Sequence, residues 1–505
     1  MKKLLKNNNG AAIVTVVFII AVVFLLCVAL INFNDSHTKN VLLSGQIEDA
    51  LQIAEAGYNH FMSYLYMDSE FYKSSEGISN PGPAGEELGF VPIDTDSAGY
   101  HVYKIITYRS GNNIIGHYQV RVKPPSVNED LTLISTGWTD QDPEIKKSVK
   151  VKLHKRSFTE YVDFTQSSGT GNNTVYWTTD NVAYGPVFCN GDIFVKGFPI
   201  FMDNVYTAGK VVEESGEAKI LGKKYENVEP AMFPVTNSEI KNWAENGGIY
   251  LEGRTCIFID GTKLYIRNNH EEYKNELLER DLPKTGVVYV KGKVFISGIL
   301  DGKLTVYATD DIYITGKNPT EKNGWNNPRN ATMTGSITVD GYNYNIGIGY
   351  QNTNIPLDRN ATGSNYSDDM LGLISEKNII IATKTWPYDN LQGYRSNHNY
   401  NNVMVPEMII YGAVMSTGGQ FMVEDFDKAP VKGRLSVYGS KIQNSSRGAV
   451  GTFDERTFRI ISGYNKQDRF DYRFKTMSPP HFVEPANSGW EIRSWEEIPN
   501  PKIIQ

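Results

Sequence analysis

The sequence predicts a mainly β protein in which one long N-terminal α-helix is followed by a small antiparallel sheet and then by a right-handed parallel β-helix. Three observations support this prediction. An apolar run near the N-terminus passes directly into an amphipathic pattern, period-two alternation follows, and most of the remaining chain consists of short apolar pairs separated by Gly, Asp and Asn. Because 505 residues are too many for one hydrophobic core, we expect several structural units.

The segment from residue 11 to residue 31 is apolar enough to cross a membrane. It carries no charge, Thr15 and Cys27 are its only side chains with a heteroatom, and about 20 apolar residues span a bilayer as a helix. A secretory signal has a shorter apolar region followed by a small-residue cleavage site, a pattern that this run lacks. A plain membrane anchor, and a leader MKKLLKNNNG that is removed after Gly10, both remain open.

The residues after the apolar run continue the helical pattern. In TKNVLLSGQIEDALQIAEAGYNHFMSYLY, apolar residues recur at steps of three or four, which is typical of an amphipathic helix. A single helix is therefore predicted from Ala11 to about Tyr66, with a length of about 80 Å at about 1.5 Å per residue, within a transmembrane and amphipathic segment placed at 11–70. The apolar positions of its second half are Leu43, Ile47, Leu51, Ala54, Tyr58, Phe61 and Leu65.

Two stretches of this helix carry a family resemblance. GAAIVTVVFIIAVVFLLCVAL at 10–30, followed by LQIAEAGYNHFM at 51–62, resembles the N-terminal region of the PilX-type minor pilins and related type IV pilus assembly proteins. The resemblance covers about the first 65 residues. It implies a prepilin leader at 1–10, cleavage between Gly10 and Ala11 by a prepilin peptidase, methylation of the new N-terminus and a pilin-like head.

The same resemblance implies that two residues of the helix take part in filament assembly. Thr15 stands where major pilins carry a glutamate, and the subunit that lacks this acid in similar systems starts the assembly, so a tip or initiating position is implied. Glu55 belongs to the AEAG motif at the end of the pilin helix. The alternative for Thr15 is that its hydroxyl bonds to a carbonyl one turn back, which any membrane helix tolerates.

Period-two alternation from residue 99 to residue 155, with turn signals at SGNN and TDQDP, predicts about four antiparallel strands. We place this pilin-like sheet at 88–156, after a loop rich in Gly, Ser and Pro. The sheet is expected to bury Ile47, Leu51 and Tyr58 of the helix. Residues 157–175 are predicted to be a linker.

Residues 176–460 are predicted to form the β-helix-like domain. Short inward-pointing pairs such as Val294 with Ile296, broken by brief turns, suit stacked coils better than the longer strands of a sandwich. The stretch GPVFCNGD resembles a segment in the large C-terminal regions of pilus assembly proteins of this type, and DYRFKTMSPP resembles their ends more loosely.

Several features are expected to decorate this domain. A long loop rich in Asn, Gly, Tyr and Thr is inserted at 317–369, and its composition suits either a recognition surface or plain decoration. Short helices are expected at 235–248 and 268–281. Residues 461–505 are expected to cap the last coil and protect its open edge.

The sequence contains no recognisable motif for catalysis. Neighbouring carboxylates such as Asp310 and Asp311 point to opposite faces of a strand, whereas a catalytic pair must converge. No two histidines have metal-ligand spacing, and Glu424, Asp425 and Asp427 are weak evidence for a calcium site. We therefore predict a protein that is not an enzyme and that needs neither a metal nor another cofactor.

Cys189 and Cys256 are the cysteines outside the apolar segment, and they either form an internal disulfide or remain buried thiols. The net charge of −7 provides no basic field, so no nucleic-acid partner is expected.

These observations together predict a minor pilin, at the tip or starting position of a type IV pilus or related pseudopilus, which is structural and presents an adhesive surface. The chain would span the cytoplasmic membrane once before assembly and then lie in the extracellular pilus or at the cell surface. Its expected partners are the prepilin peptidase, other minor and major pilins, and a surface glycan or host ligand. The alternative is a membrane-anchored cell-surface β-helix that binds or cleaves polysaccharide.

Overall fold

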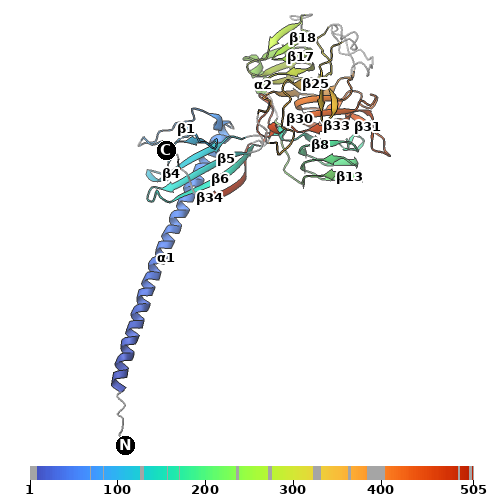
Figure 1. Ribbon diagram of the computed structural model, residues 1–505. Coiled ribbons are helices and arrows are strands. Elements are labelled where there is room, and N and C mark those ends of the chain that lie inside the picture. Colours follow the sequence, from blue (N-terminus) through green and yellow to red (C-terminus); the bar gives the residue numbers. More distant parts are fainter. Residues whose placement is uncertain are drawn as a thin grey trace. The chain divides into compact units, whose positions relative to one another are not determined.

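The computed structural model describes residues 8–68, 70–83, 85–125, 130–155, 157–169, 171–234, 238–270, 276–321, 331–361, 365–383, 404–486, 489–499 and 503. The chain forms two compact units. Unit 1 comprises Met1–Pro125, Asp130–His154 and Trp490–Gln505, and unit 2 comprises Ser126–Glu129 and Lys155–Gly489. In sequence, unit 2 is therefore an insertion into unit 1. The chain as a whole is mainly β, and one long helix begins it (Figure 1).

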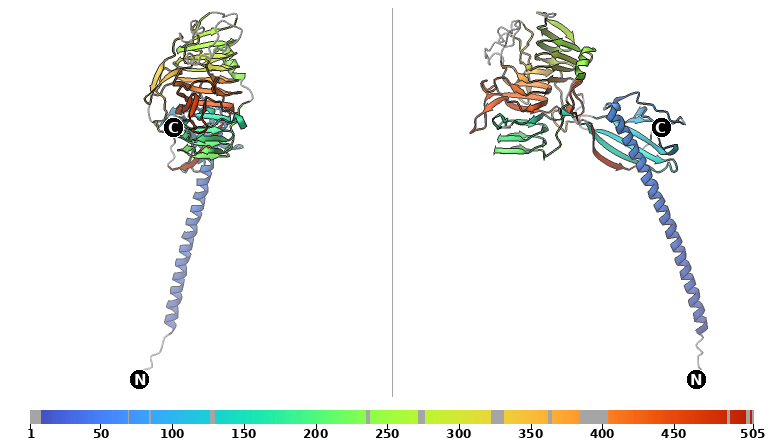
Figure 2. Two further views of the ribbon diagram at one scale, coloured as in Figure 1. Left: turned by 90° about the vertical axis from the view of Figure 1, so that its right-hand side faces the viewer. Right: turned by 180° about the vertical axis from the view of Figure 1, so that it is seen from behind.

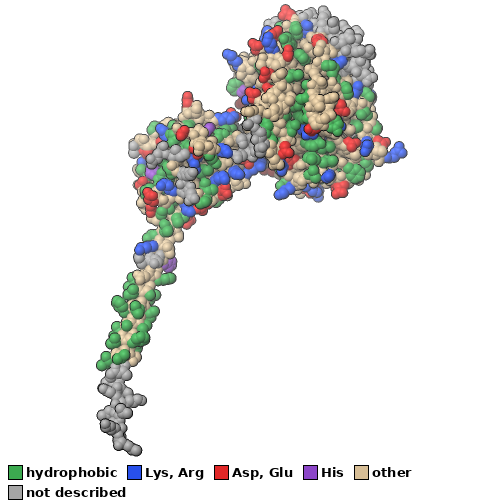
Figure 3. All heavy atoms as spheres, viewed as in Figure 1, with side chains coloured by type: hydrophobic (Ala, Val, Ile, Leu, Met, Phe, Trp, Pro, Cys, Tyr) green, Lys and Arg blue, Asp and Glu red, His purple; other side chains and the backbone are tan. Residues whose placement is uncertain are grey.

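Helix α1 (Asn8–Met67) confirms the prediction of one long N-terminal helix. All side chains from residue 13 to residue 34 are exposed. From Ile13 to Met67 the helix is long and apolar enough to cross a membrane, since an 18-residue window of it has a mean hydropathy of 3.4. Figure 3 shows hydrophobic side chains covering this stretch of α1. The second half of α1 instead buries one face against a sheet, so the two halves of one helix meet different surroundings.

The sheet of unit 1 has the order β1-β2-β4-β5-β6-β34, with β3 paired to β4. Strands β1 to β6 pair antiparallel, as the alternation predicts. The strands are β1 (Pro92–Thr95), β2 (His101–Tyr103), β3 (Ile106–Ser110), β4 (Asn113–Lys123), β5 (Leu131–Thr139), β6 (Lys146–Lys155) and β34 (Trp490–Ile498), and the 3₁₀ turn η1 (Phe71–Lys73) follows α1.

Strand β34 corrects the prediction that residues 461–505 cap the last coil. It neighbours β6 in the sheet of unit 1, where Trp490 is 6 % exposed and packs in the core with Tyr72. Lys150 and Glu496 add an ion pair at 2.9 Å between the two strands. Most side chains of β34 are exposed and polar, so its sequence shows no clear apolar face. A partner strand more than 300 residues away could therefore not be predicted from it.

The helix packs on the sheet through small residues. A Cβ added to Gly137 of β5 would lie 2.3 Å from the backbone nitrogen of Ala54, and one added to Gly57 would lie 2.3 Å from Ser135 Oγ. Ala54 and Gly57 are the first and last residues of AEAG, so this motif lets the helix backbone approach the sheet closely.

This close approach corrects the predicted buried face of α1. Ile47, Leu51 and Tyr58 are only partly buried, because the face with the small residues is turned toward the sheet instead. The spacing of the large apolar residues therefore predicted a buried face that is shifted by about one residue from the face that contacts the sheet. The fully buried apolar residues of the helix are Ala50, Ile53, Ala54, Phe61, Met62 and Leu65.

Unit 2 is built on long parallel ladders. The first consists, in spatial order, of β16 (Ile249–Glu252), β20 (Val287–Lys291), β22 (Lys303–Ala308), β26 (Met370–Ser375), β28 (Met408–Ser416), β30 (Arg434–Ser446), β7 (Asp163–Ser167), β9 (Val187–Cys189), β12 (Val205–Thr207) and β15 (Lys224–Glu226). The second consists of β21 (Val294–Leu300), β25 (Tyr342–Tyr350), β28, β30, β33 (Asn465–Arg469), β8 (Val182–Tyr184), β11 (Ile200–Phe201) and β14 (Lys219–Ile220).

The third ladder is shorter. It joins β17 (Thr255–Gly261), β21, β23 (Ile312–Ile314), β27 (Ile379–Ile381) and β29 (Phe421–Val423), while β10 (Ile193–Gly197) and β13 (Val211–Gly216) pair separately. The antiparallel additions are β18 (Lys263–Asn268), β19 (Leu278–Asp281), β24 (Ser336–Val339), β31 (Gly451–Phe453) and β32 (Ile460–Gly463). The short helices are α2 (Ser238–Glu245), η2 (Phe158–Glu160), η3 (Gly171–Asn173) and η6 (Tyr472–Lys475).

The strands of the parallel ladders do not follow one another in sequence order. The chain enters at β7, in the middle of the first ladder, and its first coils extend as far as β15. It then begins again at β16 at the other end and returns strand by strand until β30 pairs with β7. Figure 1 shows β8 and β13 on one side of β30 and β33, with β17 and β18 on the other, and the views in Figure 2 agree. Two stacks therefore meet at the pairing of β30 with β7.

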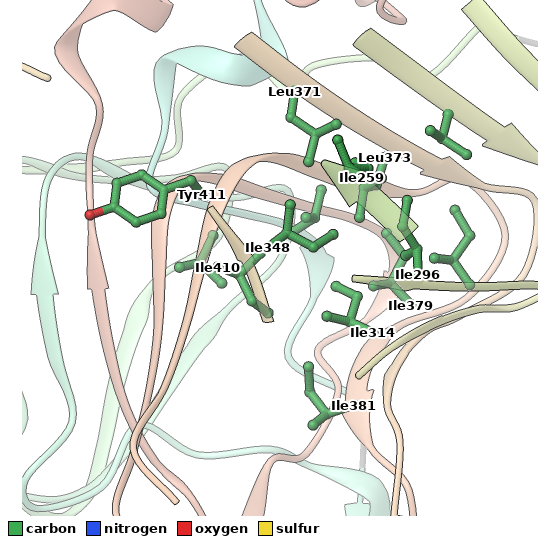
Figure 4. Close-up of a cluster of buried hydrophobic side chains, with 14 of the residues drawn as sticks. Ile259, Ile296, Ile314, Ile348, Leu371, Leu373, Ile379, Ile381, Ile410 and Tyr411 are labelled. Atoms are coloured by element: carbon green, nitrogen blue, oxygen red, sulfur yellow. The ribbon is translucent and has the colours of Figure 1, made fainter. Parts of the chain in front are cut away.

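The core of unit 2 is filled by β-branched and leucine side chains that repeat from strand to strand. Ile257, Ile296, Ile314, Ile381 and Val423 occupy matching positions of the third ladder. Figure 4 shows part of this cluster, with Ile296, Ile314 and Ile381 among the labelled side chains. A repeated inward position of this kind lets each strand of the ladder bury its apolar side chain against that of the next strand.

Three further predictions about unit 2 need correction. The linker at 157–175 contains β7, a central strand of the first ladder. The loop at 317–369 contains the hairpin of β24 and β25, and β25 belongs to the second ladder. The end of the helix predicted at 268–281 is strand β19, while α2 confirms the helix predicted at 235–248.

Candidate functional site

The residues predicted for processing and assembly all lie on α1. Gly10 and Ala11 are in its first turn, where helix ends fray, and their side chains lie outside the described residues. Thr15 is exposed within the apolar stretch. Glu55 is partly buried within AEAG and makes no ion pair with another described residue. Thr15 and Glu55 are about 60 Å apart along the helix, so the structure does not bring them together within one chain.

Of the two alternatives for Cys189 and Cys256, an internal disulfide or buried thiols, the structure shows the second, because both residues are free, buried thiols. Cys189 lies in a cluster with Phe164 and Phe188, whereas Cys256 packs with Phe295 and Tyr313 in the other stack. Burial raises the pKa of Cys189, and burial raises the pKa of Cys256 to about 12. Both sulfurs are therefore thiols at neutral pH and serve as core residues rather than as nucleophiles.

The neighbouring carboxylates examined in the sequence are held by local partners. Asp311 accepts from Lys293 at 2.8 Å, and Lys377 lies 3.0 Å from Asp310. Across the part of the chain that the structure describes, no three His, Cys, Asp or Glu side chains form a group that could hold a metal ion. Glu424, Asp425 and Asp427, which are weak evidence for a calcium site in the sequence, are therefore not gathered into such a group.

The structure instead reveals a cavity of about 580 Å³ where the two stacks of unit 2 meet. Its lining comes from the coil before β8, from β29 and its surroundings, and from the chain between β30 and β33. Hydroxyl, amide and aromatic side chains dominate this lining. They are Asn173, Thr174, Tyr176, Thr178, Asn181, Gln420, Phe426, Ser446, Thr452, Phe453 and Tyr464.

Two buried cations, Arg447 and Lys466, also line the cavity. The Arg447 guanidinium lies 3.6 Å from the ring centre of Trp177, and Lys466 Nζ lies 4.2 Å from the same ring. Arg447 Nη2 is 3.4 Å from Asp163 Oδ2, but its buried Nη1 has no hydrogen-bond acceptor among the described residues. An unsatisfied buried donor of this kind costs free energy unless something else binds it.

The charged groups beneath the cavity form a five-residue cluster of Asp163, Lys441, Arg447, Lys466 and Asp468. Lys441 Nζ donates to Asp468 Oδ2 at 2.6 Å and lies 3.2 Å from Asp163 Oδ2. Lys466 Nζ also donates to Asp163, and it lies 3.6 Å from Asp468. None of the five side chains is more than 6 % exposed. Three cationic side chains thus share two carboxylates.

The pKa values reflect this imbalance. Burial alone would raise the pKa of Asp163, but Lys441, Lys466 and Arg447 outweigh burial and hold it well below its usual range. Burial lowers the pKa of Lys466 strongly, and the positive charge of Arg447 lowers it further. The cluster therefore keeps Asp163 ionised, and Lys466 is the cation whose charge is least stabilised.

Sequence reasoning missed this cluster, although one local signal was present. Along β30, Leu435 and Val437 point inward, and Lys441 falls on the same phase of the alternation. In the first ladder Lys441 pairs with Val414 on one side and with Asp163 on the other, so charged residues replace apolar ones where the stacks meet. A charged residue on the buried phase of a strand marks a paired or functional position.

Comparison with known proteins adds little to this geometry. No protein-family model matches the chain, and no curated protein matches it. Among solved structures it is similar to the competence-associated pilin ComZ from Thermus thermophilus, with 10 % sequence identity and a TM-score of 0.32. The similarity covers 90 % of this chain and 97 % of that one. At this TM-score the two structures are too different to establish a shared fold.

Proposed function

We propose that the chain is a minor pilin, at the tip or starting position of a type IV pilus or related pseudopilus, with a structural role and an adhesive surface. In this proposal a prepilin peptidase removes residues 1–10, the new N-terminus at Ala11 is methylated, and the chain leaves the cytoplasmic membrane to join other minor and major pilins. The proposal includes no enzymatic activity, cofactor or nucleic-acid partner.

One observation carries this proposal: the two halves of α1 have opposite surroundings. Residues 13–34 expose apolar side chains on every face, while Ala54 and Gly57 bring the second half into close contact with an antiparallel sheet. A membrane anchor needs only the first half. A helix that passes without interruption from an apolar rod into a folded head suits a subunit that leaves lipid and packs with similar helices.

We also propose that unit 2 is a right-handed parallel β-helix that presents the adhesive surface. The support is the parallel pairing of successive coils and the repeated inward Ile, Leu and Val positions. The tip position is supported by Thr15, which offers no carboxylate to a neighbouring subunit, and by the size of unit 2, which would crowd a thin filament if it were repeated along the shaft.

The second candidate function is that of an anchored surface β-helix that acts on polysaccharide. The cavity of unit 2 supports polysaccharide binding, because its lining combines aromatic and hydroxyl side chains. Glycoside cleavage commonly uses two converging carboxylates, whereas Glu455 is the carboxylate among the described lining residues. The cavity therefore supports binding rather than cleavage.

Fractionation of sheared surface filaments from the native host tests the proposed function. We expect the wild-type chain to co-purify with filaments at a low ratio to the main subunit. A Gly10→Leu variant should stay in the membrane fraction, because the bulky residue would block cleavage of the leader. Asn9→Ala is the matched control and should reach the filaments. A wild-type chain that is found only in membranes would count against the proposal and favour a plain anchor.

A further inference from the structure

The cavity between the two stacks of unit 2 has the composition of a ligand site rather than of a packing defect. Its volume of about 580 Å³ falls in the range of small-molecule pockets. Packing defects in cores are apolar, whereas this cavity is lined by Arg447, Lys466 and several hydroxyl and amide side chains. The charged cluster beneath it replaces apolar residues only where the stacks meet.

The charge of the cluster specifies an anion. Among the residues that the structure describes, Lys441, Arg447 and Lys466 pair with Asp163 and Asp468, so one positive charge of this cluster lacks a counterion when all five groups are ionised. Nη1 of Arg447, a residue that lines the cavity, lacks an acceptor among the described residues. A carboxylate in the cavity would supply the missing charge, and Arg suits planar carboxylates especially well.

The remaining lining specifies what else the ligand carries. Asn181, Thr178, Gln420 and Ser446 offer donors and acceptors of the kind that bind hydroxyl groups. Tyr176 supplies an aromatic ring that two contacts hold in place, since Lys196 Nζ lies 4.2 Å from the ring centre and the Tyr176 hydroxyl donates to Glu214 at 3.0 Å. Such a ring can pack on the apolar face of a sugar.

The one carboxylate among the described lining residues does not cancel the anion preference. Glu455 is largely exposed at the rim, where it lies 3.8 Å from Lys196 Nζ. Lys196 is shared with Glu214 at 3.9 Å, but the Glu455 side chain is 74 % exposed, so solvent screens its charge, whereas Arg447 and Lys466 lie on the buried side. A ligand carboxylate that enters the cavity meets the buried cations rather than Glu455.

From these contacts we infer that the cavity binds a saccharide that carries a carboxylate group, with the carboxylate on Arg447 and Lys466 and the hydroxyl groups on the amide and hydroxyl side chains. This inference concerns unit 2 alone. It holds whether the chain is assembled into a filament or remains in a membrane, so its failure leaves the proposed function untouched, and failure of the proposed function leaves this site untouched.

Calorimetric titration of the purified full-length chain in detergent tests the inference with glucuronate, glucose and inorganic phosphate as probes. We expect saturable binding of glucuronate that is about tenfold or more tighter than binding of glucose, because glucose lacks the partner for Arg447. Phosphate should compete poorly, because it has no ring to contact Tyr176. Equal affinity for glucose, no binding of either sugar, or equal competition by phosphate would each overturn the inference.

Variants locate the site. Tyr176→Ala removes a partly exposed ring at the rim and is expected to weaken glucuronate binding about tenfold. Tyr225→Ala removes another exposed tyrosine of unit 2 that does not line the cavity, and it should leave the affinity unchanged. Arg447→Gln should abolish the preference for glucuronate over glucose. Unchanged binding in the Tyr176 variant would place the ligand elsewhere and contradict the assignment, even if the Arg447 variant fails to fold.

Discussion

Replacing Asp163 by asparagine is expected to lower the free energy of unfolding of unit 2 by about 3–5 kcal/mol. Asp163 forms ion pairs with Lys441, Arg447 and Lys466, and all four side chains are buried. The amide keeps the shape but leaves three cations with Asp468 alone. If Lys466 releases its proton, the excess of positive charge is smaller, and the loss of stability is then closer to the lower value of this range. Hydrogen exchange of peptides from β7 and β30, measured in increasing urea, reports the change.

The pH dependence of the same variant gives a second readout. The pKa of Asp163 is held well below its usual range in the folded chain, while an unfolded aspartate titrates near about 3.9. Its contribution is therefore complete above about pH 4 and is lost as the pH falls from there toward the folded pKa. The difference between wild type and Asp163→Asn should narrow in acid. Asp301→Asn, at an exposed site, is the control, and a loss below about 1 kcal/mol in the Asp163 variant would contradict the account.

Replacing Gly137 by valine is expected to destabilise unit 1 by about 3 kcal/mol or more. Valine favours strands, so intrinsic propensity predicts the opposite sign. The expected loss comes from the added Cβ, which would lie 2.3 Å from the backbone nitrogen of Ala54 and 2.7 Å from the carbonyl oxygen of Ala50. Backbone atoms of a helix cannot rotate away as a side chain can, so α1 must separate from β5.

Gly45→Ala is the matched control for this prediction. Gly45 lies in the same helix, but a Cβ there would meet nothing within 4 Å. Alanine at this position should stabilise the helix by about 0.5–1 kcal/mol. Thermal unfolding, together with hydrogen exchange of residues 50–62, distinguishes the two variants. If Gly137→Val leaves the protection of this segment unchanged, close approach of the helix is not what holds unit 1 together.

The parts of the fold that were predicted from the sequence are those with local signals. The apolar run of α1 and the alternation of β4 to β6 are each contained within a few tens of residues. The parts that were missed depend on partners far along the chain. Strand β34 pairs with β6, although the residues of unit 2 separate the two strands in the sequence. Strand β7 pairs with β30, although the composition around β7 is typical of a loop. Nothing in a local pattern specifies which coil follows which in space.

The candidate site was missed for the same reason. Its five charged residues come from β7, β30, the chain after β30, and β33, and each is surrounded by ordinary strand or turn residues. Lys441 on the buried phase of β30 was the available signal, but the polar run NKQDR around Lys466 reads as a surface segment. The two cysteines were the opposite case, since a count of residues allowed a disulfide that their separate clusters exclude.

Mass spectrometry of the N-terminus of the native, surface-exposed protein tests the central claim most directly. The claim is that α1 is a filament helix released from a short charged leader, and it predicts a mature chain that begins at Ala11 with a methylated amine. A surface-exposed protein that still carries its first ten residues, MKKLLKNNNG, would contradict the claim and leave an anchored protein with the same two units.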